Sequence, residues 1–233
     1  MTTFGQIQKA WLPEFERLQK LFHRKTAAPF LSVRPRNYDP KRVPSILYVG
    51  RATDCDWYLK EFRKIRTASF LVKKTSDFIN DPKKTHFWAF AGRLSESAAN
   101  RTRHNIKPLQ NLLWTNLYKV GALRGNPNRA LCREQRALAV ETLSREIREY
   151  KPRLIVFAMG DWEPKFEEIL DGIFKEEKLS AAAAGFWDKS GSESGYWLRR
   201  AQGRVPAILW TGHPQGARRR DKDAWLHQAC ALL

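Results

Sequence analysis

The clearest indication of the fold is the stretch Lys151-Pro152-Arg153-Leu154-Ile155-Val156-Phe157-Ala158-Met159-Gly160. Its uninterrupted apolar run, 154–159, is typical of a strand that is buried on both faces. Before it, residues 131–150 carry apolar side chains at helical spacing, and this pattern stops at Lys151-Pro152 because proline disfavours helix in the residue before it. A helix that leads into a fully buried strand is typical of a parallel sheet covered by helices.

Further strands and helices extend this pattern in both directions. Strands are expected at 46–49, 112–117 and 207–210. Helices are expected at 5–24 (begun or bent by Pro13), 57–66, 166–174 (capped by Asp161) and 223–232. Residues 180–204, rich in Ala, Gly and Ser, are interpreted as a hairpin or a mobile loop. The sequence therefore predicts an α/β fold, a three-layer α/β/α arrangement with a central, mostly parallel four-stranded sheet.

The chain divides into an N-terminal segment and one larger domain. Four prolines between 29 and 44 mark an extended connector. We therefore expect residues 1–44 to form an N-terminal helix and a proline-rich connector that packs on an α/β domain spanning 45–233. The length of 233 residues and the 42% apolar content suit a globular protein with a proper core.

The charge balance points to a polyanionic partner. The chain has 42 Lys and Arg residues against 24 Asp and Glu residues, so its formal net charge is +18. Nucleic acid is the first candidate partner and an acidic surface is the second. The simpler alternative is a basic surface that only keeps the protein in solution.

Cysteine, histidine and hydropathy patterns predict several absences. Cys55, Cys132 and Cys230 are odd in number and far apart, which argues against a disulfide framework and offers no closely spaced metal pair. The histidines form no short-spaced ligand pair, so we expect neither a metal nor a cofactor. No apolar run approaches the roughly 18 residues of a membrane helix, and residues 1–5 do not open a charged leader followed by an apolar stretch. We therefore expect a cytoplasmic monomer without a membrane partner.

A ligand site is expected where the parallel strands end, because open α/β sheets bind ligands at the carboxyl ends of their strands. That rule selects three loops: 50–54, 116–119 and 212–216. Together they offer an acid, an amide, a histidine and several backbone N–H groups. Such a set suits a polar planar ligand beside a phosphate backbone.

Four motifs, taken with their order and spacing along the chain, carry a resemblance to a known family. They are Thr115-Asn116-Leu117-Tyr118-Lys119 followed by Gly125-Asn126-Pro127-Asn128, the 151–160 stretch, Thr211-Gly212-His213-Pro214, and His86-Phe87-Trp88. Over roughly residues 45–232 the chain resembles the uracil-DNA glycosylase superfamily. The resemblance implies an enzyme that flips a deaminated base out of single- or double-stranded DNA and breaks its N-glycosidic bond.

The resemblance also implies roles for particular residues. Asn116 would read the edge of the pyrimidine, beside Gly50 and an aromatic side chain that stacks on the base, for which Phe70 is preferred to Phe78. His213 would hydrogen-bond the negative charge that develops on the leaving base. The loop 214–220 would press on the minor groove. The predicted phosphate contacts are Arg218, Arg219, Arg220 and Lys119.

The chain departs from the superfamily pattern in its first motif, Gly50-Arg51-Ala52-Thr53-Asp54. In members of the superfamily, a polar residue at the second or third position of this motif activates or places the water molecule. This chain has Arg51 and Ala52 there. Asp54 or Asp56 could supply a catalytic carboxylate instead, although either could simply cap the expected helix 57–66. Gln215 replaces the serine of the last motif, and Val120 replaces a cysteine of the iron–sulfur members, so no cluster is expected.

Three functional hypotheses follow. The first is a DNA glycosylase, and the second is a glycosylase-fold module that binds DNA or a modified base without cleaving it. The third, action on a free nucleoside or nucleotide, is disfavoured because a small ligand does not need a field of +18. At the level of single residues, Asn116 could instead be a structural buried amide, and His213 a surface residue without function.

Overall fold

The computed structural model describes residues 4–22, 26–35, 45–53, 67–82, 84–101, 109, 112–176, 196–199, 201 and 206–233. The helices within these ranges are α1 (Phe4–Ala10), α2 (Leu12–Leu21), α4 (Ala68–Asn80), α5 (His86–Arg101), α6 (Arg129–Tyr150), α7 (Phe166–Glu176) and α8 (Arg219–Leu232). The strands are β1 (Thr26–Pro29), β2 (Ile46–Gly50), β3 (Leu112–Asn116), β4 (Val120–Ala122), β5 (Leu154–Ala158), β6 (Tyr196–Arg199) and β7 (Ala207–Thr211). A short 3-10 turn covers Gly160–Trp162.

The main sheet has the strand order β3-β2-β5-β7-β6. The first four strands are parallel, which confirms the predicted mostly parallel four-stranded core. The fifth, β6, pairs antiparallel with β7 and comes from the stretch interpreted as a hairpin or loop. The register pairs Gly50 with Asn116 and Ala158 with Thr211, so the carboxyl ends of the four parallel strands lie level at one edge.

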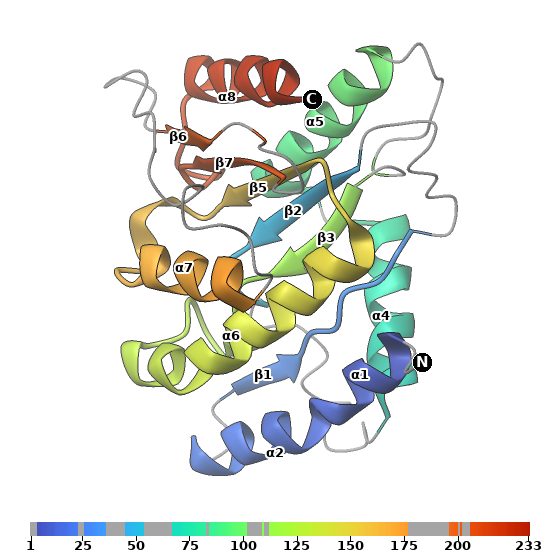
Figure 1. Cartoon of the computed structure of the whole chain (residues 1–233), viewed down its shortest axis with the longest axis vertical. Helices are drawn as coiled ribbons and strands as arrows, with labels where there is room; N and C mark the ends of the chain where they lie inside the picture. The colour runs from blue at the N-terminus through green and yellow to red at the C-terminus, as the bar shows by residue number, and fades with distance from the viewer. Residues whose placement is uncertain are drawn as a thin grey trace.

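Helices cover both faces of this sheet, as the three-layer prediction requires (Figure 1). On one face, Tyr48, Val156 and Leu209 pack in a cluster with residues of α4, α5 and α8. On the other face, Val49 and Phe157 pack with α6 and α7. Successive side chains of a strand point to opposite faces, so every second residue of these apolar runs serves a different layer. We call these faces the α5 face and the α6 face.

The N-terminal segment packs through a third cluster, in which Trp11, Phe15 and Leu18 contact side chains from α4 and α6. The predicted single helix over 5–24 is in fact two helices that meet at Trp11, with proline in the first turn of α2. That interruption follows from Pro13, which lacks an N–H and clashes with the preceding turn. β1 then pairs antiparallel with β4.

Two further details differ from the sequence-based expectation. Asp161 lies in the 3-10 turn, and α7 begins only at Phe166, so Asp161 is too far ahead to cap that helix. α8 begins at Arg219 rather than at 223, because Asp221 accepts a hydrogen bond from the backbone N–H of Arg218 and closes the first turn. The expected helix 57–66 lies outside the described residues. Within the described ranges, no helix is both long enough and apolar enough to cross a membrane.

Candidate functional site

The loops that follow β2, β3, β5 and β7 meet at the carboxyl edge of the sheet. The backbone N–H groups of Leu117 and Tyr118 donate to the carbonyls of Gly50 and Arg51, at 2.8 and 2.9 Å. These bonds join the loop after β2 to the loop after β3. These segments are therefore held together at the carboxyl edge, where a sheet of this type is expected to bind a ligand.

Gly50 lets two side chains converge on the end of β2. A Cβ at this position would lie 2.6 Å from Oδ1 of Asn116 and 3.1 Å from Cζ of Phe87. Both contacts are shorter than ordinary van der Waals separation, so a larger residue here would displace one or both side chains. Gly50, predicted as a pocket residue, thus brings the amide of Asn116 and the ring of Phe87 together on the α5 face.

The amide of Asn116 is buried without being satisfied. The residue is 2% exposed, and its Nδ2 atom has no hydrogen-bond partner among the described residues. Other buried atoms also lack a hydrogen-bond partner among the described residues, including the Ser144 hydroxyl and Oε1 of Glu146, but the Asn116 amide lies at the carboxyl edge, where a ligand is expected. A buried N–H group without a partner costs about 1–3 kcal/mol. A ligand that accepts a hydrogen bond from Asn116 would remove that cost.

His213 follows β7 and lies against Phe87, with ring centroids 5.9 Å apart and ring planes 21° from parallel. Its Nδ1 accepts a hydrogen bond from the backbone N–H of Gln215 at 3.3 Å. Burial, together with the nearby charge of Arg51, lowers the pKa of His213 from 6.5 to about 4. The imidazole is therefore neutral near pH 7, and because Nδ1 is an acceptor, the ring proton lies on Nε2 as a donor.

Arg51 is the cation of the site, and the sequence pattern flagged it only as a departure. Its Nε donates to the carbonyl of Met159 at 2.7 Å, and its guanidinium carbon lies 5.6 Å from the ring centroid of Trp162. A Cβ placed on Gly160 would be 3.4 Å from the His213 backbone nitrogen and 3.5 Å from Nη2 of Arg51. Burial lowers the pKa of Arg51. The side chain thus crosses from the end of β2 to the end of β5, beside His213.

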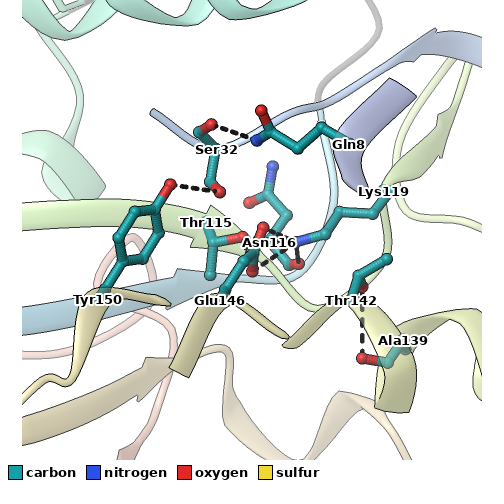
Figure 2. Close-up of polar contacts among 9 residues, drawn as sticks. All are labelled: Gln8, Ser32, Thr115, Asn116, Lys119, Ala139, Thr142, Glu146 and Tyr150. Carbon is teal, nitrogen blue, oxygen red and sulfur yellow. Dashed lines mark hydrogen bonds and ion pairs between the residues drawn. The ribbon is translucent and has the colours of Figure 1, made fainter. Parts of the chain in front are cut away.

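Lys119 was predicted to contact phosphate, and the structure contradicts this. Its ammonium is buried on the α6 face, where it donates to Oγ1 of Thr115 at 2.5 Å, to the backbone carbonyl of Asn116 at 3.0 Å and to Glu146 at 2.9 Å (Figure 2). Lys119 is 1% exposed and the side chain of Glu146 is 0% exposed. Three acceptors use all three ammonium protons. Lys119 therefore holds the end of β3 in place, and its ammonium is not accessible to a phosphate.

The structure also favours a different aromatic residue from the one preferred on sequence. Phe70 lies in the first turn of α4, where the Lys74 ammonium sits 5.3 Å from its ring. Its neighbour Leu71 packs in the N-terminal cluster. Phe87, by contrast, contacts the position of Gly50 and stacks beside His213. Its place in the His86-Phe87-Trp88 motif was the sequence signal that could have selected it.

Carboxylates at this edge are already engaged where the structure describes them. Glu163, 3% exposed, accepts a hydrogen bond from the Tyr118 hydroxyl at 2.7 Å and pairs with Arg136 at 3.2 Å. Glu146 is held by Lys119. The predicted catalytic residues Asp54 and Asp56 lie outside the described residues, so their candidacy as general bases stays a prediction.

A basic groove lies beside the site, between α5 and α8, which run next to each other (Figure 1). Its volume is about 440 Å³, and its lining consists of His86, Ala89, Phe90, Arg93, Arg219 and Lys222. Lys222 donates to the carbonyl of Pro214, the residue after His213, at 3.3 Å. Asp223 forms ion pairs with two of these cations, Arg93 and, at 3.9 Å, Arg219. The groove therefore carries net positive charge up to the His213 loop.

The three arginines predicted to grip phosphates have different surroundings. Arg218 binds the carboxylate of Asp221, with Nε 3.1 Å from Oδ2. The side chain of Arg219 is 93% exposed and lines the groove, with Nε 3.9 Å from Oδ2 of Asp223. The side chain of Arg220 is 58% exposed, with Nε 3.7 Å from Oδ1 of Asp221. Arg219 is the most accessible of the three to a phosphate.

Within the described ranges, no group of three or more His, Cys, Asp or Glu side chains could hold a metal ion. Neither a scan against protein-family models nor a search of curated proteins finds a match to this chain.

Proposed function

We propose that this chain is a DNA N-glycosylase that binds a flipped, deaminated pyrimidine such as uracil at the carboxyl edge of its sheet. The observation that carries the proposal is the buried Nδ2 atom of Asn116, which has no hydrogen-bond partner among the described residues and lies beside Gly50 and Phe87. An amide has both a donor and an acceptor, which is what reading the edge of a base requires. A base held there would lie close to the ring of His213.

The proposed reaction breaks the bond between C1′ of the sugar and the ring nitrogen of the base. The bonding electrons leave with the base, and the oxygen of a water molecule forms a new bond to C1′. The water then loses a proton, and the base anion gains one, so the products are a free base and an abasic sugar. Catalysis of this kind depends on donors placed where the negative charge develops.

His213 is the proposed donor to the leaving base. It is neutral near pH 7 and keeps its proton on Nε2, because Nδ1 is occupied by the N–H of Gln215. A neutral donor stabilises a developing anion while leaving the neutral base bound in the ground state. This differential stabilisation is what raises a rate.

The α5–α8 groove supports DNA rather than a free base as the substrate. Its cations adjoin the His213 loop, and one counterion is released for roughly each phosphate that they contact. A phosphate strand along this groove would lead a nucleotide to the site.

A second function is favoured by Arg51. Arg51 occupies the position at which enzymes of the uracil-DNA glycosylase superfamily have a polar residue that activates or places water. A guanidinium group cannot act as a general base. A glycosylase-fold module that binds a base in DNA without cleaving it would retain the Asn116 pocket and the groove. It would lack only a functional carboxylate.

Single-turnover cleavage of labelled DNA separates the two functions. Uracil, hypoxanthine, xanthine and mismatched thymine are tested in single and double strands, with the wild type and the variants His213→Ala, Asp54→Asn and Asp56→Asn. We expect uracil excision by the wild type and a loss of about 10²–10³-fold in His213→Ala, as for removal of an oxyanion donor. Base-dependent binding without excision would establish the recognition module. If the protein shows neither base-dependent binding nor excision, both functions are rejected.

A further inference from the structure

We propose that Arg51 and His213 form an anion-binding subsite that holds the negatively charged leaving base, with Arg51 in place of the water-activating residue of similar sites. This inference rests on the proposed function for the identity of the ligand, a pyrimidine base. It assigns to Arg51 a role that its position in the first motif does not suggest.

The geometry around Arg51 leaves part of its guanidinium available. Only Nε is used in the described structure, by the carbonyl of Met159. Trp162 supports the guanidinium through its ring. No carboxylate among the described residues forms an ion pair with Arg51, in contrast to Arg136, which binds Glu163. Both terminal nitrogens can therefore donate to a ligand.

The surroundings of Arg51 favour an anionic ligand. Partly buried charge is costly unless it is paired, and burial already lowers the pKa of Arg51. His213 lies close by, since a Cβ on Gly160 would be 3.4 Å from its backbone nitrogen and 3.5 Å from Nη2 of Arg51. The charge of Arg51 adds to the effect of burial in lowering the pKa of His213. An anion bound between the two would compensate the guanidinium and accept from Nε2 of His213. The neutral imidazole adds no competing negative charge.

The place of this charge in the reaction follows from where electrons move. When the C1′–N bond breaks, the electron pair passes to the base and spreads onto its ring oxygens and nitrogens. A guanidinium beside those atoms stabilises the anion, and a proton from water later neutralises it. A purely structural arginine, which only ties Met159 and Trp162 together, would not respond to the acidity of the leaving base.

Leaving-group acidity therefore provides the test. Uracil and 5-fluorouracil have nearly the same shape, but fluorine makes the second a more acidic, better leaving base. Single-turnover excision of each from otherwise identical DNA is compared for the wild type, Arg51→Gln and Arg51→Lys. Arg145→Gln is the matched control, because Arg145 is exposed on α6, away from the site, and loses the same charge.

We expect Arg51→Gln to lose about 10²-fold on uracil but only about tenfold on 5-fluorouracil, since the better leaving group needs the cation less. Arg51→Lys keeps the charge but lacks the planar guanidinium, so on each substrate its excision rate should lie between those of Arg51→Gln and the wild type. Arg145→Gln leaves the ratio of the two rates unchanged. An equal loss on both substrates in Arg51→Gln would overturn the subsite while leaving the glycosylase intact.

Failure of the proposed function gives a different pattern, in which the wild type excises neither base. Titration calorimetry with free uracil, free 5-fluorouracil and inorganic phosphate then decides the subsite alone. A preference for 5-fluorouracil over uracil that grows with pH and disappears in Arg51→Gln supports it. Binding that is indifferent to Arg51, or preferential binding of phosphate over both bases, overturns it.

Discussion

At the carboxyl edge, the buried Lys119 on the α6 face and the buried Asn116 amide on the α5 face differ in their hydrogen-bond partners. On the α6 face, hydrogen bonds join Lys119, Thr115 and Oε2 of Glu146 in a buried network. Oε1 of Glu146 has its ion pair with Lys119 but no hydrogen-bond partner among the described residues. On the α5 face, the Nδ2 atom of Asn116 is buried without a described partner. Asn116 belongs to both, because its backbone carbonyl accepts from Lys119. The paired groups hold the end of β3, and Nδ2 of Asn116 is the group that we propose a ligand uses.

The largest effect is expected from breaking the paired face. Lys119→Met leaves the buried carboxylate of Glu146 without its cation, and such a loss costs about 3–5 kcal/mol in the free energy of unfolding. Urea unfolding measures it. The double variant Lys119→Met/Glu146→Gln is the control, because it removes both charges and should recover part of the loss. Equal stability of the single variant and the wild type would show that the network is not structural.

A smaller free-energy change, in binding rather than in folding, is expected from the unpaired face. Asn116→Ala removes an amide that is buried without a full set of partners, so the unfolding free energy should change by less than about 1 kcal/mol. Affinity for uracil-containing DNA should fall by about 5–100-fold, the value of one or two hydrogen bonds.

The control for this comparison is Ser144→Ala, which removes another buried, unpartnered polar atom but on α6. It should leave DNA affinity unchanged. If Asn116→Ala destabilised the protein strongly and kept its affinity, the amide would belong to the structural face after all.

The α5–α8 groove is expected to make DNA affinity depend on salt concentration. Arg219→Ala should lower the slope of log affinity against log salt by about 0.9 if the side chain contacts one phosphate of duplex DNA. Fluorescence anisotropy over a salt series measures the slope. Arg145→Ala, on the opposite side of the sheet, should leave it unchanged. Identical slopes for all three proteins would place the DNA elsewhere.

The smallest effect concerns the titration of His213. Arg51→Gln removes a neighbouring positive charge, so the pKa of His213 should rise above its value of about 4, although burial keeps it below 6.5. Titration of the imidazole by NMR measures this shift. In the wild type, the unfolded chain binds the extra proton between these two pH values, so His213 makes the fold less stable as pH falls from 6.5 to 4. The variant should lose less stability over this interval, and an unmoved pKa would separate Arg51 from His213.

Several features of this protein are determined by local sequence. The strands 46–50, 112–116, 154–158 and 207–211 are apolar runs, and glycine or proline lies close to the ends of most of them, so their type and place could be predicted directly. The places of Asn116 at the end of β3 and of His213 after β7 follow from the same pattern, because parallel strands end at one edge.

Other features depend on residues that meet only in the folded chain. The sequence does not show that Lys119 is buried, because its partner Glu146 comes from α6 and the two share no local pattern. The choice of Phe87 over Phe70 depends in the same way on how α5 packs against Gly50. Local propensity is set by neighbours along the chain, whereas burial and pairing are set by the packing of distant segments. That packing decides which charges support the sheet and which side chains lie at the proposed site.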